Sequence, residues 1–268
     1  QNGINFGPEP FVDLNNDGKI EIIVSGSDLD NKPLSEVFSI NKTNEIQKYS
    51  YQIDSLKYSS VSIGDYDNNG FNDLIVTGNN GISRKTIIFN NNEGKLFNIS
   101  SPIKNVDNGY AAWGDFDNDG FLDIALQGLQ KDVYYLYDGP NLRAIHTDGS
   151  NITWFYKNEN NNSFAEKLQL SAYLRYSYGR INCGDYDNDG DLDLVVNNIN
   201  KPAFIFINNN RQSKTDSTNH FLTIALQGDS LNRHGIGTKV YVYHGDAVQL
   251  QEQNPARGYF SSVDQRLF

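Results

Sequence analysis

The sequence predicts an all-β protein made of β-propeller blades, about four of which are visible, followed by a small C-terminal β unit. Three observations favour this fold class. A nine-residue acidic loop recurs with its first residue at 13, 65, 115 and 185, at intervals of 52, 50 and 70 residues. Each copy is followed by a short run of apolar, often β-branched residues, and no long stretch has a helical period. Repeats of about 40 to 50 residues with several strands each are typical of propeller blades.

The four loops, called here the first (13–21), second (65–73), third (115–123) and fourth (185–193) loop, have the composition of a calcium site. Carboxylates stand at positions one, three, five and nine, and glycine stands at position six. Where the carboxylate at three or five is missing, Asn15 or Asn69 keeps a side-chain oxygen. Ca²⁺ takes six to eight oxygen ligands, which such alternating residues supply together with a main-chain oxygen at position seven. We therefore expect four Ca²⁺ sites, with the ligands Asp13, Asn15, Asp17, Lys19, Glu21, Asp65, Asp67, Asn69, Phe71, Asp73, Asp115, Asp117, Asp119, Phe121, Asp123, Asp185, Asp187, Asp189, Asp191 and Asp193.

Three alternatives to this interpretation are weaker. An EF-hand loop opens in the same way, but it requires a glutamate at position twelve and a helix on each side. Position twelve is Val24, Val76, Leu126 or Val196, and the residues around it predict a buried strand. A dockerin would also require a helix there. Four solvated acidic turns without ions would not explain why each substitution keeps an oxygen ligand.

The composition excludes some classes of function. The formal net charge of −11 argues against nucleic-acid binding, which requires basic patches. Fourteen of the 33 acidic residues are proposed ligands, and four bound Ca²⁺ would offset eight of the eleven net negative charges, so most of the net charge belongs to the loops. The one cysteine, Cys183, cannot form an internal disulfide and is expected to be a small core residue. No run of about 18 apolar residues predicts membrane insertion.

Around each loop the sequence predicts further strands. One precedes the loop in the later copies, whereas the first copy lacks an upstream strand. A third strand is expected at 86–92, 153–158 and 204–209, and Phe97 and Phe164 each open a fourth strand. The excess length of the third interval lies near 137–149, where glycine and proline predict a surface loop or an extra hairpin. The aromatic residues beside it could form a sugar-stacking surface, or they could belong to the blade strands: Tyr134, Tyr135, Tyr137, Trp154 and Tyr156.

At 113–123 and 184–193 the chain resembles FG-GAP/VCBS repeats, because the sequences WGDFDNDGFLD and GDYDNDGDLD match that motif. The resemblance covers roughly residues 1–210 and implies blades of an integrin α-like propeller, usually a ring of about seven. Residues 219–268 resemble the ASPIC/UnbV domain, which follows FG-GAP repeats in the cartilage acidic protein family and its bacterial relatives. The expected organisation is blades at 1–210, a linker at 211–218 and a truncated ASPIC/UnbV-like unit at 219–268.

The predicted function is a calcium-binding module, secreted or at the cell surface, for adhesion or for binding a protein or glycan ligand. Since the chain begins with Gln and contains no Met, we expect a mature or excised piece of a longer propeller protein. Extracellular millimolar Ca²⁺ suits such sites. The alternative is a calcium-dependent enzyme, because some proteins that resemble this architecture are cyclases, alkylating enzymes or polysaccharide lyases. Only His146, Arg233, His234 and Tyr259 could be proposed as catalytic groups, and no sequence motif assembles them. Outside the loops, Asn232, Arg233, His234 and Arg257 could line a pocket, or they could shape turns and bind main-chain carbonyls.

Overall fold

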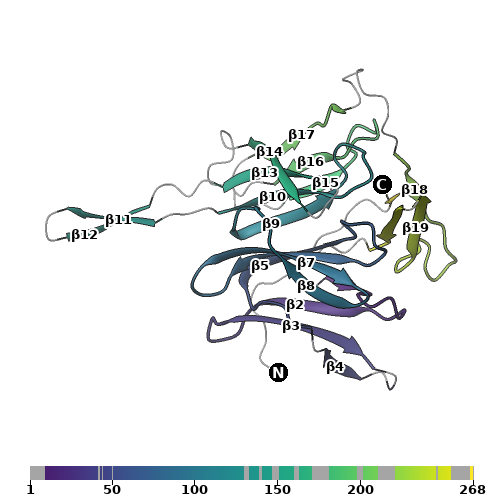
Figure 1. The fold of residues 1–268 in the computed structure, drawn as a ribbon, viewed down its shortest axis with the longest axis horizontal. Coiled ribbons are helices and arrows are strands. Elements are labelled where there is room, and N and C mark those ends of the chain that lie inside the picture. The colour runs from purple at the N-terminus through teal and green to yellow at the C-terminus, as the bar shows by residue number, and fades with distance from the viewer. Residues whose placement is uncertain are drawn as a thin grey trace.

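The computed structural model contains strands and no α-helix among the residues it describes (Figure 1). These are residues 10–41, 43, 45–49, 51–129, 133–138, 141–146, 151–159, 163–170, 181–197, 202–210, 221–245, 247–254 and 266–267. Within them, no helix is long and apolar enough to cross a membrane.

Four antiparallel sheets follow one another along the chain, in the manner of propeller blades. The first contains β1 (Phe11–Val12), β2 (Glu21–Ser27), β3 (Pro33–Ile40) and β4 (Ile46–Tyr49). The second contains β5 (Lys57–Gly64), β6 (Asp73–Asn79), β7 (Arg84–Asn92) and β8 (Lys95–Ile99). The third contains β9 (Asp107–Gly114), β10 (Asp123–Leu129), β13 (Asn151–Asn158) and β14 (Phe164–Leu170). The fourth contains β15 (Ile181–Gly184), β16 (Asp193–Val196) and β17 (Phe204–Phe206).

The apolar run after each loop forms the second strand of its sheet, and in the second and third sheets this strand is buried because a neighbouring sheet packs on each of its two faces. In the second sheet, Leu74 and Val76 join the core shared with the first sheet, whereas Ile75 joins the core shared with the third. A smaller core, which contains Leu194 and Val196, lies between the third and fourth sheets. Cys183 packs against this last core, as expected of a small core residue. Successive sheets are therefore stacked face to face, as Figure 1 shows.

The prediction that the first copy lacks an upstream strand is wrong. Phe11 and Val12 form β1, with Phe11 opposite Ile22 and Val12 opposite Glu21 in β2. The strand was missed because two residues are too few to show an alternating pattern. The other strands predicted around the loops are present, although the third strand of the fourth repeat ends at Phe206 and not at 209. Phe97 lies in β8, and Phe164 is the first residue of β14.

The insertion in the third repeat is a hairpin, formed by β11 (Val133–Asp138) and β12 (Asn141–His146). It extends away from the third sheet (Figure 1). Trp154 and Tyr156, which the sequence placed among candidates for a sugar-stacking surface, are each 1% exposed and belong to the core between the second and third sheets. Those two residues are therefore blade residues. The side chains of Tyr134, Tyr135 and Tyr137 lie outside the described residues.

The C-terminal segment (described residues 221–245, 247–254 and 266–267) contains two small sheets. Here β19 (Lys239–His244) and β20 (Ala247–Glu252) form a hairpin, and β18 (Ile224–Ala225) pairs with β21 (Arg266–Leu267). The strands of this C-terminal β unit are short, since β18 covers two residues and β19 covers six. Residues 232–237 form a turn, in which Asn232 accepts from Ile236 N and donates to its carbonyl. The predicted linker lies outside the described residues.

Candidate metal centre

The four acidic loops occupy equivalent places in the four sheets. Each connects the first strand of its sheet to the second, so β1–β2, β5–β6, β9–β10 and β15–β16 each enclose one loop. The first residue of the second strand is the residue at position nine of the loop. The fold therefore repeats the candidate site together with the blade.

Main-chain amides hold the carboxylate at position one. In the second loop, Asn69 N donates to Asp65 Oδ1 at 3.0 Å and Gly70 N donates to Asp65 Oδ2 at 2.9 Å. The equivalent pairs of bonds are made to Asp13, Asp115 and Asp185, at 2.9–3.3 Å. The glycine at position six has φ between +81° and +94° in all four loops, a conformation that a Cβ atom disfavours. The positive φ at position six therefore explains why all four loops have glycine there.

The carboxylate at position nine ties the loop to its blade. In the second loop, Asp73 Oδ2 accepts from Tyr66 N at 2.9 Å, and Asp73 Oδ1 accepts from Asn91 N at the end of β7 at 2.7 Å. Asp123 and Asp193 accept the same two kinds of bond. Glu21 Oε2 accepts from Leu14 N at 2.9 Å. Several of the expected ligands are therefore held in place by the fold itself.

Three of the loops gather carboxylate oxygens closely enough to hold a metal ion. Among the described residues, ligand atoms at positions one, three and nine lie within 4.8 Å of one another in the second, third and fourth loops. In the second loop, Asp67 Oδ1 is buried and has no hydrogen-bond partner. A buried carboxylate oxygen that accepts no hydrogen bond is costly unless a cation contacts it. The residues of this loop therefore fit a cation. That the carbonyl oxygens of Lys19, Phe71, Phe121 and Asp191 are ligands stays a prediction.

Burial and crowding of these carboxyl groups raise their pKa values. Burial raises the pKa of Asp73 to about 9, and the neighbouring carboxylates Asp67 and Asp65 add to the shift. For the same chief reason, the pKa of Asp65 rises to about 7 and that of Asp123 to about 7. Burial also raises the pKa of Glu21 to about 7. Without a cation, these loops consequently hold protons more tightly than ordinary carboxyl groups do.

The first loop differs from the others, because Asn15 stands at position three and a lysine contacts position one. Lys239 Nζ, from the C-terminal segment, donates to Asp13 Oδ2 at 2.8 Å. In the third loop, by contrast, a lysine contacts the carboxylates at positions three and five. Lys157 Nζ, from β13, contacts Asp117 Oδ2 and lies 2.7 Å from Asp119 Oδ2. Neither lysine was identified from the sequence.

The asparagine at position four links neighbouring loops in a row. Asn16 donates from Nδ2 to Gly70 O at 2.9 Å, and Asn68 donates to Gly120 O at 2.9 Å. Asn118 continues the series to the fourth loop, with Gly190 O at 3.4 Å. All four position-four residues have φ between +56° and +58°, a region that asparagine enters more readily than most residues. The signal was in the sequence, since Asn occurs at this position in every loop, but it was not assigned a role.

A second set of asparagines, at the end of the third strand, joins each blade to the one before. Asn91 donates from Nδ2 to Leu14 O in the first loop and to Asn72 O in the second, both at 2.8 Å. The equivalent contacts are made by Asn158, to Tyr66 O and Leu122 O, and by Asn208, to Phe116 O and Leu192 O. The sequence places these residues within the predicted third strands at 86–92, 153–158 and 204–209 and assigns them no role.

The polar group proposed in the C-terminal segment is not assembled into a pocket by its described members. Asn232, Arg233 and His234 are exposed, and Asn232 shapes the turn at 232–237, as the alternative interpretation predicted. Arg257 and Tyr259 lie outside the described residues, as does the side chain of His146.

Two family models match segments of the chain. The family model described as FG-GAP-like repeat matches residues 13–76 and 65–126, and the model described as ASPIC and UnbV matches residues 228–268. No curated protein has a matching sequence. A solved structure of an Agrocybe aegerita lectin, described as recognising non-reducing terminal N-acetylglucosamine, is similar at 16% identity with a TM-score of 0.34. The match covers 75% of this chain and 66% of that one.

Proposed function

We propose that this chain, which carries FG-GAP-like repeats followed by an ASPIC and UnbV segment, is a calcium-binding propeller module. The observation that carries the proposal is the repeated cluster of carboxylate oxygens at positions one, three and nine, with the buried, unpartnered oxygen of Asp67 in the second loop. These loops are pre-organised by main-chain hydrogen bonds, so an ion would meet ligands that are already in place.

The donor set favours Ca²⁺ over other biological metals. The three clusters contain carboxylates and no histidine or cysteine, which is the ligand chemistry of Ca²⁺, Mg²⁺ and Mn²⁺. Each loop also offers the side chain at position five and the carbonyl at position seven, which raises the number of oxygens toward the six to eight that Ca²⁺ takes. Mg²⁺ demands tighter octahedral geometry and retains water. Four sites are proposed, one in each loop.

The module acts outside the cytoplasm, where Ca²⁺ is abundant, in adhesion or in binding a protein or glycan ligand. FG-GAP repeats are typical of integrin-like propellers, and this supports a role in adhesion or ligand binding outside the cytoplasm. The chain would act together with the remainder of a longer propeller. Binding to a glycan array and to extracellular matrix proteins, each with Ca²⁺ and with EDTA, tests this part. Equal binding in both conditions would contradict a calcium-dependent ligand site.

The calcium sites themselves are tested by counting ions. Native mass spectrometry in millimolar Ca²⁺ should find four ions on the chain, and Asp67→Ala should lose one of them, because it removes the position-three ligand of the second loop. Asp54→Ala, which removes an exposed carboxylate outside the loops, should lose none. If Asp67→Ala retained the full count, the assignment of the second loop would be wrong.

The charge of Lys157 should set the affinity of the third loop. The number of carboxylates alone predicts that the third and fourth loops bind Ca²⁺ more tightly than the first and second. Since Lys157 contacts Asp117 and Asp119, its positive charge should offset part of that advantage. We expect Lys157→Met to raise the Ca²⁺ affinity of the third loop by roughly tenfold, because it removes a positive charge a few ångströms from the ion.

The measurement for this variant is a calcium titration followed by hydrogen exchange in a peptide covering the third loop. Lys167→Met is the matched control, because it removes a lysine from the adjacent strand β14 whose partner is Glu159, outside the loop. If the third loop became protected at the same Ca²⁺ concentration in wild type and in Lys157→Met, the lysine would not affect calcium affinity, because it moves away from the loop at no cost in free energy.

A further inference from the structure

The C-terminal segment contacts all four acidic loops. Lys239 contacts the first loop, Leu250 N donates to Asp65 Oδ2 at 3.3 Å in the second, and Gln249 Nε2 donates to Gly120 O at 2.7 Å in the third. In the fourth loop, Arg266 Nη1 lies 3.4 Å from Asn188 Oδ1. The segment therefore lies along the edge where the candidate metal sites are found, although it is more than 200 residues from the first of them in sequence.

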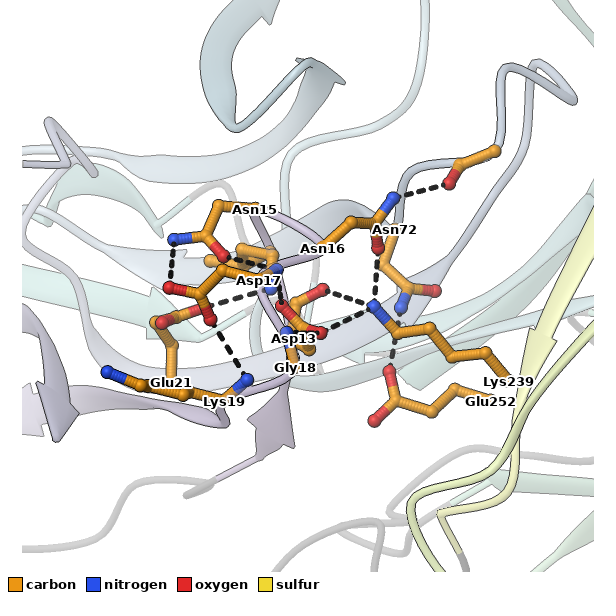
Figure 2. A network of polar contacts seen from close by, with 12 residues as sticks. Asp13, Asn15, Asn16, Asp17, Gly18, Lys19, Glu21, Asn72, Lys239 and Glu252 are labelled. Carbon is orange, nitrogen blue, oxygen red and sulfur yellow. Dashed lines mark hydrogen bonds and ion pairs between the residues drawn. The ribbon is translucent and has the colours of Figure 1, made fainter. Parts of the chain in front are cut away.

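The contact with the first loop is an ion pair removed from water. Lys239 Nζ donates to Asp13 Oδ2 at 2.8 Å, lies 3.3 Å from Asp13 O, and also contacts Asn16 Oδ1. The side chains of Lys239 and Asp13 are only 15% and 8% exposed. Figure 2 shows Lys239 on one side of Asp13, and Asp17 and Glu21 on the other. An ion held by Asp13, Asp17 and Glu21 would thus be a second cation on the same carboxylate.

We propose that Ca²⁺ in the first loop and docking of the C-terminal hairpin β19–β20 through Lys239 oppose each other. Both the ion and the ammonium group draw on the carboxylate of Asp13, and their charges repel one another where little water screens them. Coupling between two binding events is reciprocal, so the docked lysine weakens calcium binding and bound calcium weakens docking. The inference rests on the proposed calcium sites and adds a means by which one of them controls the C-terminal segment.

The charges around Lys239 restrict this effect to the first loop. Glu252 lies near Lys239 and Asp13, and its Oε2 accepts from Asn72 Nδ2 at 2.9 Å (Figure 2). The negative charge of Glu252 offsets part of the positive charge of Lys239 whether or not an ion is present. The hairpin meets the second and third loops through the neutral donors Leu250 N and Gln249 Nε2, and its Glu252, which also contacts the second loop, brings no positive charge. Calcium there would meet no opposing charge from the hairpin.

The test is a calcium titration of the full chain, followed by hydrogen exchange and mass spectrometry in peptides covering 11–22 and 239–254. In Lys239→Met, the first loop should become protected at a roughly tenfold lower Ca²⁺ concentration than in wild type, by the same Coulombic argument. Lys239→Arg should behave like wild type, because it keeps the charge. Lys48→Met, which removes an exposed lysine paired with Glu36, should leave the midpoint unchanged.

The reciprocal effect is measured with Asp17→Ala, which removes a position-five ligand that does not contact Lys239 in Figure 2. For each protein, hydrogen exchange of residues 239–254 is compared between saturating Ca²⁺ and EDTA. Ca²⁺ should lower the protection of these residues more in wild type than in Asp17→Ala. Identical first-loop midpoints in wild type and Lys239→Met, with the loops otherwise responding to Ca²⁺, would overturn the inference alone. A chain in which no loop responded to Ca²⁺ would overturn the proposed function and the inference with it.

Discussion

Removal of calcium is expected to lower the melting temperature of this protein by more than about 15 °C at pH 8, and by much less at pH 5. A ligand that binds only the native state stabilises it by about 2.7 kcal/mol when its concentration is a hundred times its Kd. Several loops contribute in this way, and for a chain of this size each kcal/mol corresponds to roughly 2–4 °C. The estimate thus follows from occupancy of at least two or three loops.

The dependence on pH follows from the raised pKa values of the carboxyl groups. Asp73, Asp65, Asp123 and Glu21 have folded-state pKa values of about 7 to 9, above the ordinary values of 3.8 and 4.5. In the calcium-free protein, the folded state therefore holds these protons more tightly than the unfolded state does. The stability that they contribute is complete below about pH 4 and is lost as the pH rises through 7 to 9. Calcium replaces the protons, so the calcium-bound protein does not lose that stability.

Thermal unfolding in Ca²⁺, Mg²⁺ and EDTA at pH 5, 6.5 and 8 measures the effect. Mg²⁺ should restore little stability, because it releases its water reluctantly. Calcium addition near pH 7 should also release protons in a weakly buffered solution. Superimposable melting curves at pH 8 would mean that the loops have no structural role for a metal. A difference between Ca²⁺ and EDTA as large at pH 5 as at pH 8 would contradict the assigned protonation.

Much of the architecture could be predicted because it repeats. A loop that recurs four times with the same ligand positions identifies the candidate sites, and the apolar run after each loop identifies the central strand of each sheet. The insertion that contains β11–β12 followed from turn-forming residues in an interval that was too long, although the sequence left a surface loop and a hairpin both open. The two-residue strand β1 was missed because it is held by its pairing with β2, and pairing leaves no pattern in so short a segment.

The neighbours of the loops could not be predicted because they come from elsewhere in the chain. Lys157 is 40 residues from Asp117, and Lys239 is 226 residues from Asp13. Nothing in the sequence around either lysine indicates that its charge meets an acidic loop. The candidate ligands therefore follow from local sequence, whereas the charge that modifies their affinity follows from tertiary packing. An order of affinity based on carboxylate count alone omits the second effect.

The repeated asparagines give the blades a common orientation. Each loop after the first accepts a hydrogen bond from the position-four asparagine of the preceding loop, and each blade after the first sends a third-strand asparagine back to the preceding loop. In the first blade the residue equivalent to Asn91 is Ile40. Phe38 pairs with Ile22 in the first sheet as Phe89 pairs with Leu74 in the second, and Ile40 and Asn91 each lie two residues further along the third strand. No preceding blade lies against Ile40 among the described residues.

Replacement of Asn91 by alanine should destabilise the protein by about 3 kcal/mol. The Asn91 side chain is fully buried and binds Leu14 O, Asn72 O and Gly94 N. Its removal leaves buried main-chain groups of two blades without partners, and each such group costs about 1–3 kcal/mol. The amide of residue 91 would still reach Asp73 Oδ1, so the loss would not come from that bond.

Urea unfolding of Asn91→Ala, in Ca²⁺ and in EDTA, measures this contribution. Asn92→Ala is the matched control, because Asn92 is the exposed neighbour on the same strand and its loss should change stability by less than about 0.5 kcal/mol. Because the Asn91 side chain binds the carbonyl of Leu14 in the first loop and that of Asn72 in the second, its loss should also weaken calcium binding in these two loops. Equal stabilities of the two variants would show that water replaces the Asn91 amide, and that apolar packing between the sheets is what joins the blades.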